Sequence, residues 1–495
     1  MATQQFLAVD LGAESGRGML GAFDGARVTL RELGRFATSR GEQDIGPDGV
    51  RRWDWPRITG EIRALLRQAQ GETGGALAGV GVDSWGVDFG LLDAQGRLLE
   101  MPLHYRNDAN PPAMARALGV IAKEELWAAT GIQPLAFNTL FQLAAVQARE
   151  PSLLKRAATL LFVPDLAHHA LTGGAARGAE RTEASTSQMM TPGARAWQPE
   201  LLTRLGMPSQ FLGPLVEPGS PVGTAEGGTP IYAPATHDTA SAVAAVPFEA
   251  GRAGVFLSSG TWSLFGVERP SPVLSLDALN AGFSNEGGVA GTTRFLKNIM
   301  GLWLVQECRR SLRRSEGRDY SYAELTALAA EAPADGPLVD AADPRFLAPP
   351  DMADEIRTAC RESGQPEPEG AEALIRCCLE SLALAYRHAL ENLSRITGMA
   401  FEVIHIVGGG SQNKVLNQWA ADACGLPVIA GPGEVTALGN VLGQLVASGA
   451  VKYWAEARQV SRQSAAGEEF TPDPVAHATW DERAAHWERL RVDAG

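Results

Sequence analysis

Two short segments of the same design, one at the start of the chain and one near its middle, most constrain the fold. The first reads FLAVDLGAESGRGMLGAF over residues 6–23, and the second reads RAGVFLSSGTWSLFGVE over residues 252–268. Each combines an apolar strand pattern, a small polar turn with glycine and a second apolar strand. Such a repeat at half-chain spacing indicates two domains related by duplication, each with its own hairpin.

Strand and helix patterns alternate along the rest of the chain, which is typical of an α/β fold with a parallel core. The 495 residues are long enough for several domains, and we place the boundary in 247–252, so that residues 1–248 and 249–495 form the two halves. A helix is expected over 371–398, ending at Gly398, and a surface helix in 477–495. The charged or Gly/Pro-rich segments 309–320 and 361–370 are predicted to be loops.

The charge of the chain excludes several partners. Its net charge of −14 repels nucleic acid and anionic lipid, and no dense basic run offsets it. No apolar run reaches about 18 residues and no signal-peptide pattern precedes Phe6, so we expect a cytoplasmic protein without a membrane partner. The five cysteines are too scattered for a disulfide framework; a reversible bridge between Cys360 and Cys377 is left open.

The two glycine hairpins are candidate anion sites. A tight turn points successive backbone N–H groups at one place, and such a nest binds an anion without net charge. Gly12 and Gly16 are expected to supply backbone conformations that other residues resist, while Ser15 and Arg17 add a hydroxyl donor and a cation. The second turn, at residues 258–261, offers similar donors. One such turn is weak evidence, since Gly and Ser are common turn residues, but a matched pair favours two phosphate sites.

Two carboxylates in the first hairpin need an explanation. Asp10 ends an apolar strand, where an unpaired carboxylate costs several kcal/mol, so we expect it to have a partner. Mg²⁺ reached through water is one candidate, and a turn in which Asp10 accepts backbone N–H groups is the alternative. Glu14 would repel a phosphate, so its side chain is predicted to point away from the site, with only its amide used.

A third candidate is ATHDTASA, where an apolar strand leads directly into an Ala-rich helix within 230–246. It presents His237, Asp238 and Thr239 at the carboxyl end of the strand. Asp238 is equally well explained as the N-cap of that helix or as the carboxylate that accepts a proton from an alcohol during phosphoryl transfer. This segment alone does not separate the two.

Three further segments carry polar or glycine residues at unusual places. Gly408, Gly409 and Gly410 lie between a strand and a helix, where either a nucleotide or close backbone packing would require glycine. Lys297, Asn298 and Gln306 occur among apolar residues at helical spacing. In DSWGVDF, Trp85 is more often a core residue than a sugar platform, and Gly86 follows it at a strand break.

Taken together, these segments resemble the FGGY carbohydrate kinases of the actin-like ATPase superfamily. VDLGAESGR, DSWGVDF, THDTASAV, SSGTWSLFG, NEGG, LKNIMGLWL and HIVGGGSQN occur in the family's order between about residues 6 and 450. The resemblance implies an α/β fold of two actin-like, ribonuclease-H-like domains, each with a mixed sheet flanked by helices, and a central cleft that holds Mg·ATP between them. Most of the sugar site would lie in residues 1–248 and the adenosine site in 249–495.

The resemblance is nearest to members that phosphorylate L-rhamnulose at O1, and it assigns roles to particular residues. ATP would contact Ala13, Glu14, Ser15, Gly16, Arg17, Thr261, Gln306 and Gly409. The sugar would contact Gly86, His237, Asp238, Thr239 and Asn298, with Asp238 as the catalytic proton acceptor. Where many members have YRD, this chain reads YRND, so no role is carried over to Arg106, Asn107 or Asp108.

Two alternatives remain at this point. A sister kinase acting on L-fuculose, xylulose or ribulose would differ only in a few pocket contacts, each worth about 1–3 kcal/mol. An actin-like ATP-binding assembly or regulatory protein would need neither Asp238 as a base nor the sugar-side segments, so their presence favours the enzyme. Its expected partners are ATP and a ketose, and it is expected to be a monomer or a small homo-oligomer.

Overall fold

The computed structural model describes residues 3–249, 251–464 and 467–491, and the chain divides into two compact units. Unit 1 contains residues 1–247, 268–295 and 434–465, and unit 2 contains residues 248–267, 296–433 and 466–495. The break after Pro247 lies next to the predicted boundary. The predicted C-terminal half, however, contributes two segments to unit 1. One of them contains helix α16 (Val435–Ser448), which packs on the strands β1 (Gln4–Leu11) and β4 (Leu77–Ser84).

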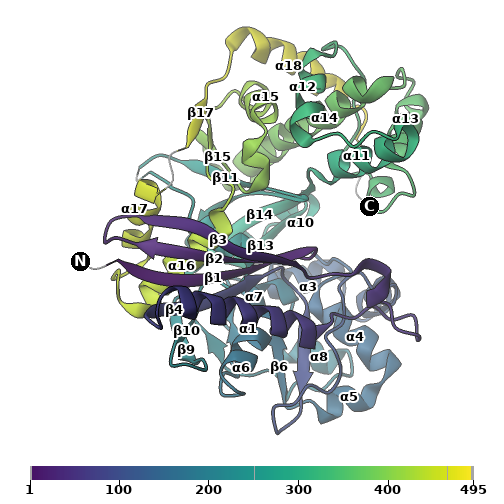
Figure 1. Cartoon of the computed structure of the whole chain (residues 1–495). Helices are drawn as coiled ribbons and strands as arrows, with labels where there is room; N and C mark the ends of the chain where they lie inside the picture. Colours follow the sequence, from purple (N-terminus) through teal and green to yellow (C-terminus); the bar gives the residue numbers. More distant parts are fainter. Residues whose placement is uncertain (1–2, 250, 465–466, 492–495) are drawn as a thin grey trace. The chain divides into compact units, whose positions relative to one another are not determined.

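Unit 1 is built on a mixed six-stranded sheet (Figure 1). Its strand order is β3-β2-β1-β4-β10-β9, in which β1 pairs antiparallel with β2 (Ser15–Phe23) and parallel with β4. The remaining strands of this sheet are β3 (Val28–Ala37), β9 (Ser220–Thr224) and β10 (Pro230–Ala233). The strand–turn–strand prediction for residues 6–23 is therefore confirmed, and β10 lies parallel to β4 at the centre of the sheet.

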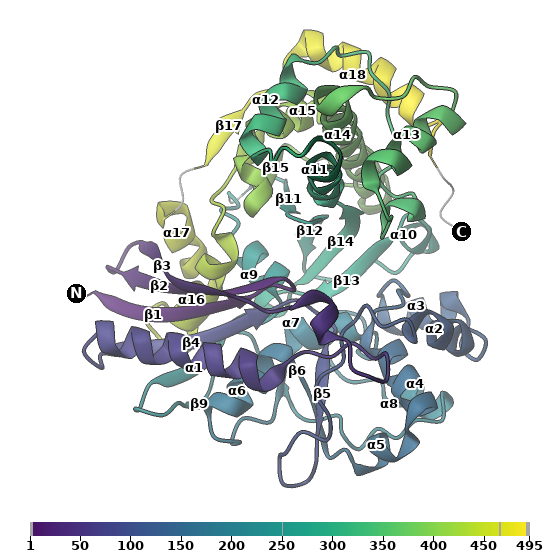
Figure 2. The same ribbon diagram turned by 45° about the vertical axis from the view of Figure 1, so that its right-hand side comes forward.

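Helices cover both faces of this sheet, and successive residues of its strands face opposite helices. Val80 and Val82 of β4 join the core cluster beneath helix α1 (Trp55–Glu72), which runs along these strands in Figure 2. Gly79 and Gly81 face the other way, toward Gln444 and its neighbours on α16. The small glycines allow α16 to approach closely, so a helix late in the sequence becomes part of unit 1.

Much of the rest of unit 1 is helical, and residues between Phe89 and Phe211 form a second core cluster. Its short strands are β5 (Phe89–Leu92), β6 (Thr159–Phe162), β7 (Ala179–Glu180), β8 (Leu215–Val216) and β13 (Phe283–Gly287). Its helices are α2 (Asn110–Leu118), α3 (Lys123–Thr130), α4 (Thr139–Arg149), α5 (Pro151–Arg156), α6 (Val163–Leu171), α7 (Arg181–Ala184), α8 (Pro199–Arg204), α9 (Asp238–Ala244), α10 (Leu276–Asn280) and α17 (Trp454–Ser464).

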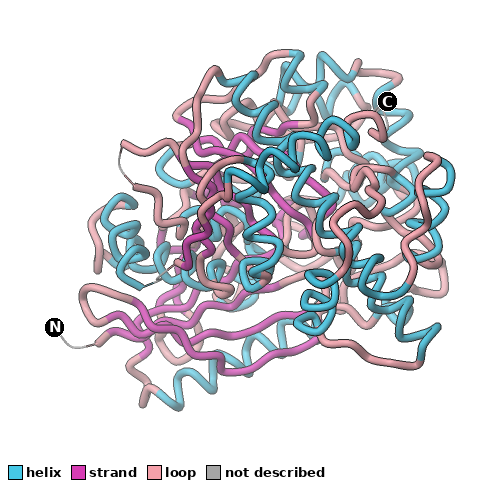
Figure 3. The backbone as a smooth tube through the Cα atoms, turned by 90° about the horizontal axis from the view of Figure 1, so that it is seen from above, coloured by secondary structure: helices cyan, strands magenta, loops and turns pink. Residues whose placement is uncertain are grey.

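The second sheet repeats the design of the first. Its order is β13-β14-β12-β11-β15-β16-β17, in which β11 (Gly254–Ser259) pairs antiparallel with β12 (Trp262–Arg269) and parallel with β15 (Val403–Val407). The other strands are β14 (Thr293–Met300), β16 (Val428–Ala430) and β17 (Glu468–Phe470). The second hairpin is thus confirmed, and Figure 3 shows strands bordered by helices throughout.

The helices of unit 2 centre on α14 (Gly370–Thr397), which is largely buried. It ends at Gly398 in the left-handed conformation, with φ of 67°, as predicted from the glycine. The others are α11 (Trp303–Glu316), α12 (Tyr322–Glu331), α13 (Met352–Glu362), α15 (Lys414–Cys424) and α18 (Pro474–Trp487). Helix α18 confirms a helix near the C-terminus; residues 492–495 of that prediction lie outside the described part.

Two local predictions were wrong. Segment 309–320 is not a loop over its first part, because α11 continues to Glu316 with buried Leu304, Cys308 and Leu312 on one face and arginines outward. Residues 293–300 form strand β14, so the helical spacing inferred for Lys297 and Asn298 is incorrect. Segment 361–370 starts in the last turn of α13 and continues as a loop to α14.

Two negative observations hold within the described residues. No helix among them is both long and apolar enough to cross a membrane. The five cysteines are all free thiols, and Cys360 and Cys377 are both buried.

Candidate active site

The first hairpin holds an ion-pair cluster. Asp10 lies opposite Arg17 across β1 and β2, and Arg17 donates two hydrogen bonds to Asp10 Oδ2, at 2.9 and 2.8 Å. The guanidinium also contacts Glu434, which directly precedes α16 in the same unit. The partner that Asp10 requires is therefore Arg17 in this structure, and the positive charge predicted for phosphate binding is shared with two carboxylates.

The glycines of this hairpin make room for neighbouring atoms and do not adopt unusual dihedral angles. Neither Gly12 nor Gly16 has a positive φ, so the predicted conformational role is wrong. A Cβ on Gly16 would lie 2.5 Å from the ring of Phe36, and one on Gly12 would lie 3.0 Å from the carbonyl oxygen of Ser15. Glu14 is exposed and its carbonyl accepts a hydrogen bond from the amide of Thr38, while the direction of its side chain stays a prediction.

A second carboxylate, which was not predicted as a site residue, lies beside Asp10. Asp83 is opposite Asp10 across β1 and β4, and it is fully buried. Its Oδ2 accepts a hydrogen bond from Asn440 of α16 at 2.6 Å, while its Oδ1 has no partner among the described residues. Burial, together with the charge of Asp10, raises the pKa of Asp83 well above its ordinary value.

The DSWGVDF segment forms a rigid turn after β4. Trp85 is buried against Trp53, with ring centroids 4.3 Å apart, so the core interpretation of this tryptophan is confirmed. Both indole nitrogens donate to Asp88 Oδ2, at 2.7 Å from Trp53 and 3.0 Å from Trp85. Val87 has φ of 74°, an unfavourable conformation for a β-branched residue, which tertiary contacts maintain.

Gly86 faces the side chains expected to bind the sugar. A Cβ on Gly86 would lie 3.1 Å from Thr186 Cγ2 and 3.3 Å from His237 Nε2. Thr186 is itself fixed, because its hydroxyl donates to the carbonyl of Glu183 at 2.8 Å and accepts from the amide of Val87 at 3.1 Å. The structure thus brings Gly86 and His237, two residues far apart in sequence, into contact.

Asp238 is the first residue of helix α9, and His237 is the N-cap residue, so the N-cap interpretation of Asp238 is wrong. Its Oδ1 accepts hydrogen bonds from the amide of Thr239 at 2.5 Å and from the Thr239 hydroxyl at 3.0 Å. Its side chain is 33% exposed, which leaves the carboxylate reachable. Burial of the group, opposed by His237 and reinforced by Asp10, raises the pKa of Asp238 above the ordinary value.

Buried acids surround this loop. Glu180 Oε2 accepts from the amide and the hydroxyl of Thr236, at 3.0 and 2.8 Å, and so fixes the loop before His237. Glu183 is fully buried, and neither of its carboxylate oxygens has a partner among the described residues. Burial, with the charge of Asp165 added, raises the pKa of Glu183 well above its ordinary value. Neither glutamate was predicted, since nothing in residues 180–190 distinguishes a buried glutamate from an exposed one.

In unit 2, the second hairpin contacts another of the predicted residues. Thr261 Oγ1 donates to Gln306 Oε1 at 3.3 Å, which joins the β11–β12 turn to α11. A Cβ on Gly301 would lie 2.8 Å from both the carbonyl oxygen of Gly260 and the amide of Ser263, so glycine is required for this close approach.

The three consecutive glycines after β15 have different surroundings. Gly408 has φ of 85°, and a Cβ on it would lie 2.9 Å from the carbonyl oxygen of Ser259. A Cβ on Gly410 would lie 2.6 Å from Ser259 Cβ. Gly409 is exposed with no atom within 4 Å of its Cβ position. Close backbone packing therefore explains Gly408 and Gly410, whereas only Gly409 has room for a ligand beside it.

The remaining predicted residues are more dispersed. Asn298 is half-buried in the part of β14 that belongs to unit 2. Asn107 has a structural role, because its Oδ1 accepts from the amide of Arg51 at 2.8 Å and its Nδ2 donates to the carbonyls of Arg51 and His104. Arg106 lies over the ring of Tyr105, and Asp108 is exposed.

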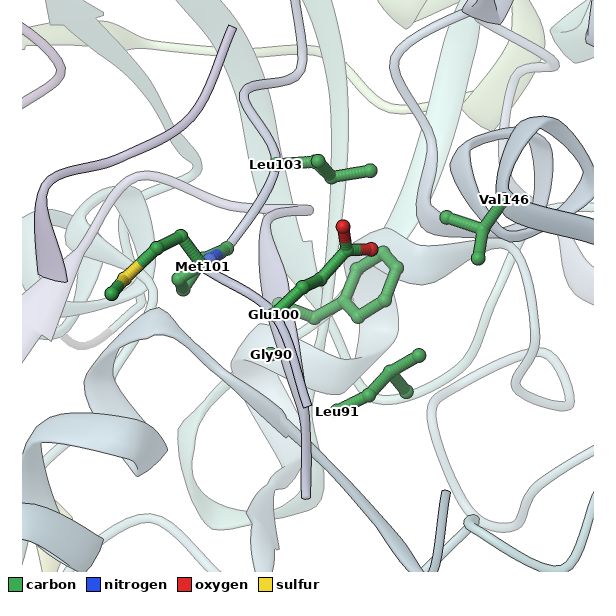
Figure 4. A pocket seen from close by; sticks show the side chains of 8 residues that line it. Gly90, Leu91, Glu100, Met101, Leu103 and Val146 are labelled. Atoms are coloured by element: carbon green, nitrogen blue, oxygen red, sulfur yellow. The ribbon is translucent and has the colours of Figure 1, made fainter. Parts of the chain in front are cut away.

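Two features of the described residues set limits on the site. No group of three or more His, Cys, Asp or Glu side chains in this part of the chain could hold a metal ion. A pocket in unit 1, shown in Figure 4, is lined by Phe89, Leu91, Glu100 and their neighbours and includes no predicted site residue. We do not associate it with the chemistry.

Two family models match this sequence. The model of the N-terminal domain of the FGGY family of carbohydrate kinases matches residues 6–230, and that of the C-terminal domain matches residues 255–448. The chain belongs to the FGGY family of carbohydrate kinases. This confirms the resemblance that the seven motifs indicated, and it makes the protein a carbohydrate kinase.

Individual family members extend the comparison over nearly the whole chain. It is 42% identical over 480 residues to a rhamnulokinase from Klebsiella pneumoniae (strain 342), which covers 96% of each protein. It is 40% identical over 493 residues to a rhamnulokinase from Bacteroides thetaiotaomicron, which covers 98% of this chain and 99% of the relative.

Solved structures show the same fold at low identity. A xylulose kinase from Rhodospirillum rubrum has a TM-score of 0.78 and 20% identity, covering 98% of both chains. A gluconate kinase from Lactobacillus acidophilus has a TM-score of 0.80 and 14% identity, covering 99% of this chain and 98% of the other. The family's α/β fold of two domains with mixed sheets is thereby confirmed for this chain.

Proposed function

We propose that the protein transfers the γ-phosphoryl group of ATP to O1 of L-rhamnulose, giving L-rhamnulose 1-phosphate and ADP. The observation that carries this proposal is the match to proteins named rhamnulokinase over nearly the full length of both chains, at 42% identity in the Klebsiella relative. The xylulose and gluconate kinases share the fold at much lower identity and carry no argument about the sugar.

In this proposal Asp238 is the proton acceptor. Phosphoryl transfer to an alcohol needs a carboxylate that orients the hydroxyl and takes its proton. Asp238 Oδ1 is fixed by Thr239, and the carboxylate remains one-third exposed, so one face is free to meet a hydroxyl. Its raised pKa makes it a stronger base than an ordinary aspartate.

We propose that the sugar is held by Gly86, His237, Thr239 and Asn298, and that residues 1–248 supply most of this site. The space in front of Gly86 supports the proposal, because a methyl group there would approach both Thr186 and His237. Glycine thus leaves free the position beside the His237 ring that a methyl group would occupy.

For ATP, we propose contacts from Ala13, Glu14, Ser15, Gly16 and Arg17 in unit 1, and from Thr261, Gln306 and Gly409 in unit 2. The open space beside Gly409 and the hydrogen bond between Thr261 and Gln306 support the second set. Residues 249–495 would then provide the adenosine site. Arg17 must balance the charge of Asp10 and Glu434 as well as that of phosphate.

We also propose Mg²⁺ as the metal, with Asp10 facing it through water. The residues fit such a role, because Mg²⁺ is commonly held by one or two carboxylates together with substrate phosphates and water, and not by a cage of protein ligands. When bound, Mg²⁺ would supply positive charge for the phosphate oxygens. Asp10 would keep its negative charge in place through its hydrogen bonds from Arg17. The reaction is proposed to occur in the cytoplasm.

A coupled ADP-release assay with Mg·ATP and a panel of ketoses tests the proposal. L-rhamnulose should have the highest kcat/KM among L-rhamnulose, L-fuculose, xylulose and ribulose. A higher value with one of the other ketoses would assign the protein to a sister activity, and absence of turnover with every sugar would favour a regulatory or assembly role. Asp238→Asn should lose turnover by orders of magnitude, while Asp24→Asn, at an exposed turn, serves as the control.

A further inference from the structure

A buried charge network lies directly behind His237. It joins Glu286 of β13 and Arg294 of β14 to the His237 ring, and all three residues belong to unit 1. Arg294 has no exposed surface, and His237 and Glu286 are each 7% exposed. A buried guanidinium is costly unless it is paired and hydrogen-bonded, so the contacts of Arg294 determine how this region is arranged.

The contacts of Arg294 define that arrangement. Its Nε donates to the carbonyl of Gly287 at 2.8 Å, which fixes the guanidinium along β13. Its Nη2 lies 3.0 Å from Glu286 Oε2 and 3.0 Å from His237 Nδ1. Burial raises the pKa of Glu286, but the nearby Arg294 and His237 outweigh this and hold that pKa below its ordinary value, so Glu286 is an anion.

The hydrogen bond to His237 has a consequence for the imidazole ring. A guanidinium can only donate, so the 3.0 Å contact with Arg294 Nη2 is a hydrogen bond when Nδ1 offers its lone pair, whereas an Nδ1–H would be directed at Glu286 Oε2, 3.3 Å away. The shorter contact, to Arg294, favours the lone pair on Nδ1. In a neutral ring the proton is then on Nε2. From the side of the ring that faces the predicted site, Nε2 lies 3.5 Å from Asp238 Oδ1 and 3.3 Å from the Cβ position of Gly86.

We propose that Glu286 and Arg294 are positioning residues, which hold His237 with its Nε2–H directed at the substrate hydroxyl that Asp238 is to deprotonate. This inference rests on the proposed function. With Nε2–H as a donor, His237 binds a hydroxyl oxygen through its lone pair and leaves the hydroxyl proton for Asp238. With the opposite tautomer, the ring nitrogen would compete with Asp238 for that proton.

The charged groups around the ring come from several elements. Asp238 follows it on α9, Glu286 and Arg294 face it from β13 and β14, and Glu183 of α7 lies near both acids. The backbone amide of His237 donates to Thr182 Oγ1 at 3.3 Å. Arg294 alone among these four side chains is a donor without acceptor capacity, and it lies nearer to Nδ1 than Glu286 does, so it favours the tautomer with the proton on Nε2.

The first test reads the tautomer without reference to activity. Long-range ¹H–¹⁵N NMR of protein labelled with [¹⁵N]histidine resolves the ring nitrogens of the eight histidines, and loss of one signal set in His237→Gln assigns His237. We expect a protonated Nε2 in the wild type. In Arg294→Gln, the proton should move to Nδ1, toward Glu286 at 3.3 Å. A wild-type ring protonated at Nδ1 alone would overturn the proposal, even if the variant does not fold.

The second test is a double-mutant cycle on L-rhamnulose kinetics. Arg294→Gln should raise KM about tenfold or more with a smaller change in kcat. In the His237→Gln background, the same substitution should change KM by less than twofold. Equal effects in both backgrounds would refute positioning through His237. If the wild type phosphorylates no L-rhamnulose, the proposed function fails, while the NMR experiment still decides the tautomer.

Unit 1 offers a matched control for loss of a buried ion pair. Glu268, whose side chain is 9% exposed, pairs with Arg458 and accepts a hydrogen bond from Thr292. Glu268→Gln should lower the melting temperature about as much as Arg294→Gln and leave KM for the sugar within twofold. A comparable rise in KM in this control would show that the kinetic effect reflects general destabilisation, and would contradict a specific role for Arg294.

Discussion

Gly409 and Gly410 provide a paired test of the nucleotide site, because neighbouring glycines meet opposite surroundings. A Cβ on Gly410 would lie 2.6 Å from Ser259 Cβ, which is about 0.8 Å closer than the shortest ordinary contact of 3.4 Å. Ser259 is buried on β11 and cannot move without disturbing the sheet. Overpacking of this kind costs about 1–3 kcal/mol. Gly410→Ala should therefore lower the melting temperature by roughly 3–10 °C.

Gly409→Ala should have the reverse pattern. Its Cβ position has no atom within 4 Å and its φ is not positive, so alanine fits the folded backbone. By restricting the unfolded chain, the substitution should leave stability unchanged or raise it by about 0.4–1 kcal/mol. If the nucleotide lies against this residue, the added methyl group should weaken ATP binding about tenfold or more, equivalent to about 1.4 kcal/mol.

Differential scanning fluorimetry and isothermal titration of ATP measure the two quantities on the same preparations. An ATP dissociation constant for Gly409→Ala within twofold of the wild type would refute the placement of Gly409 at the nucleotide. A melting temperature for Gly410→Ala equal to that of the wild type would refute the packing of this turn against Ser259.

Three further predictions concern unit 1. Gly86→Ala should raise KM for the ketose at least tenfold with little change in melting temperature, because its Cβ approaches His237 Nε2 at 3.3 Å without severe overlap; an unchanged KM would remove Gly86 from the sugar site. Asp238 must be ionised to accept a proton, so kcat/KM should fall as pH drops through its pKa, and the midpoint should lie above the ordinary value because burial raises that pKa; a midpoint at or below the ordinary value would contradict this. Gly439→Ala should prevent unit 1 from folding properly, since its Cβ would lie 2.5 Å from the carbonyl carbon of Ser241 in α9; wild-type yield and melting temperature would contradict the close packing of α16 on α9.

Local signals in the sequence explain which elements could be predicted. The two hairpins were identified because apolar strands on both sides of a glycine turn are a pattern within some twenty residues. Helix α14 and its end at Gly398 were predicted from equally local signals. The helical spacing around Gln306 was right, but the rest of helix α11 was missed because the arginines of its exposed face outweighed the buried Leu312 in a reading by composition. Lys297 and Asn298 were misread because a short strand and a short helix segment give similar apolar runs.

Candidate site residues could be predicted only where adjacent residues of one segment together indicate a chemical role. His237, Asp238 and Thr239 are adjacent, so a single motif revealed them. The partners that shape their surroundings are distant: Arg17 contacts Glu434 across 417 positions and Asn440 reaches Asp83 across 357. Such contacts depend on how the strands and helices pack, which no pattern in a single sequence specifies.

The same limit explains the unpredicted acids. A glutamate in NEGG or in RTEASTSQMM reads as a solvated residue, because burial of Glu286 and Glu183 becomes visible only when β13 and α7 are packed. The opposite error occurred at Gly12 and Gly16, where a conformational role was inferred and the glycines instead make room for neighbouring atoms.

The central claim is that the protein phosphorylates the primary hydroxyl of L-rhamnulose with Asp238 as the base. ³¹P NMR of a reaction with Mg·ATP and L-rhamnulose tests it directly. We predict one new phosphomonoester whose phosphorus couples to the two C1 protons, formed in step with ADP and lost in Asp238→Asn. Inorganic phosphate without an ester, an ester at another hydroxyl, or undiminished product with Asp238→Asn would contradict the account.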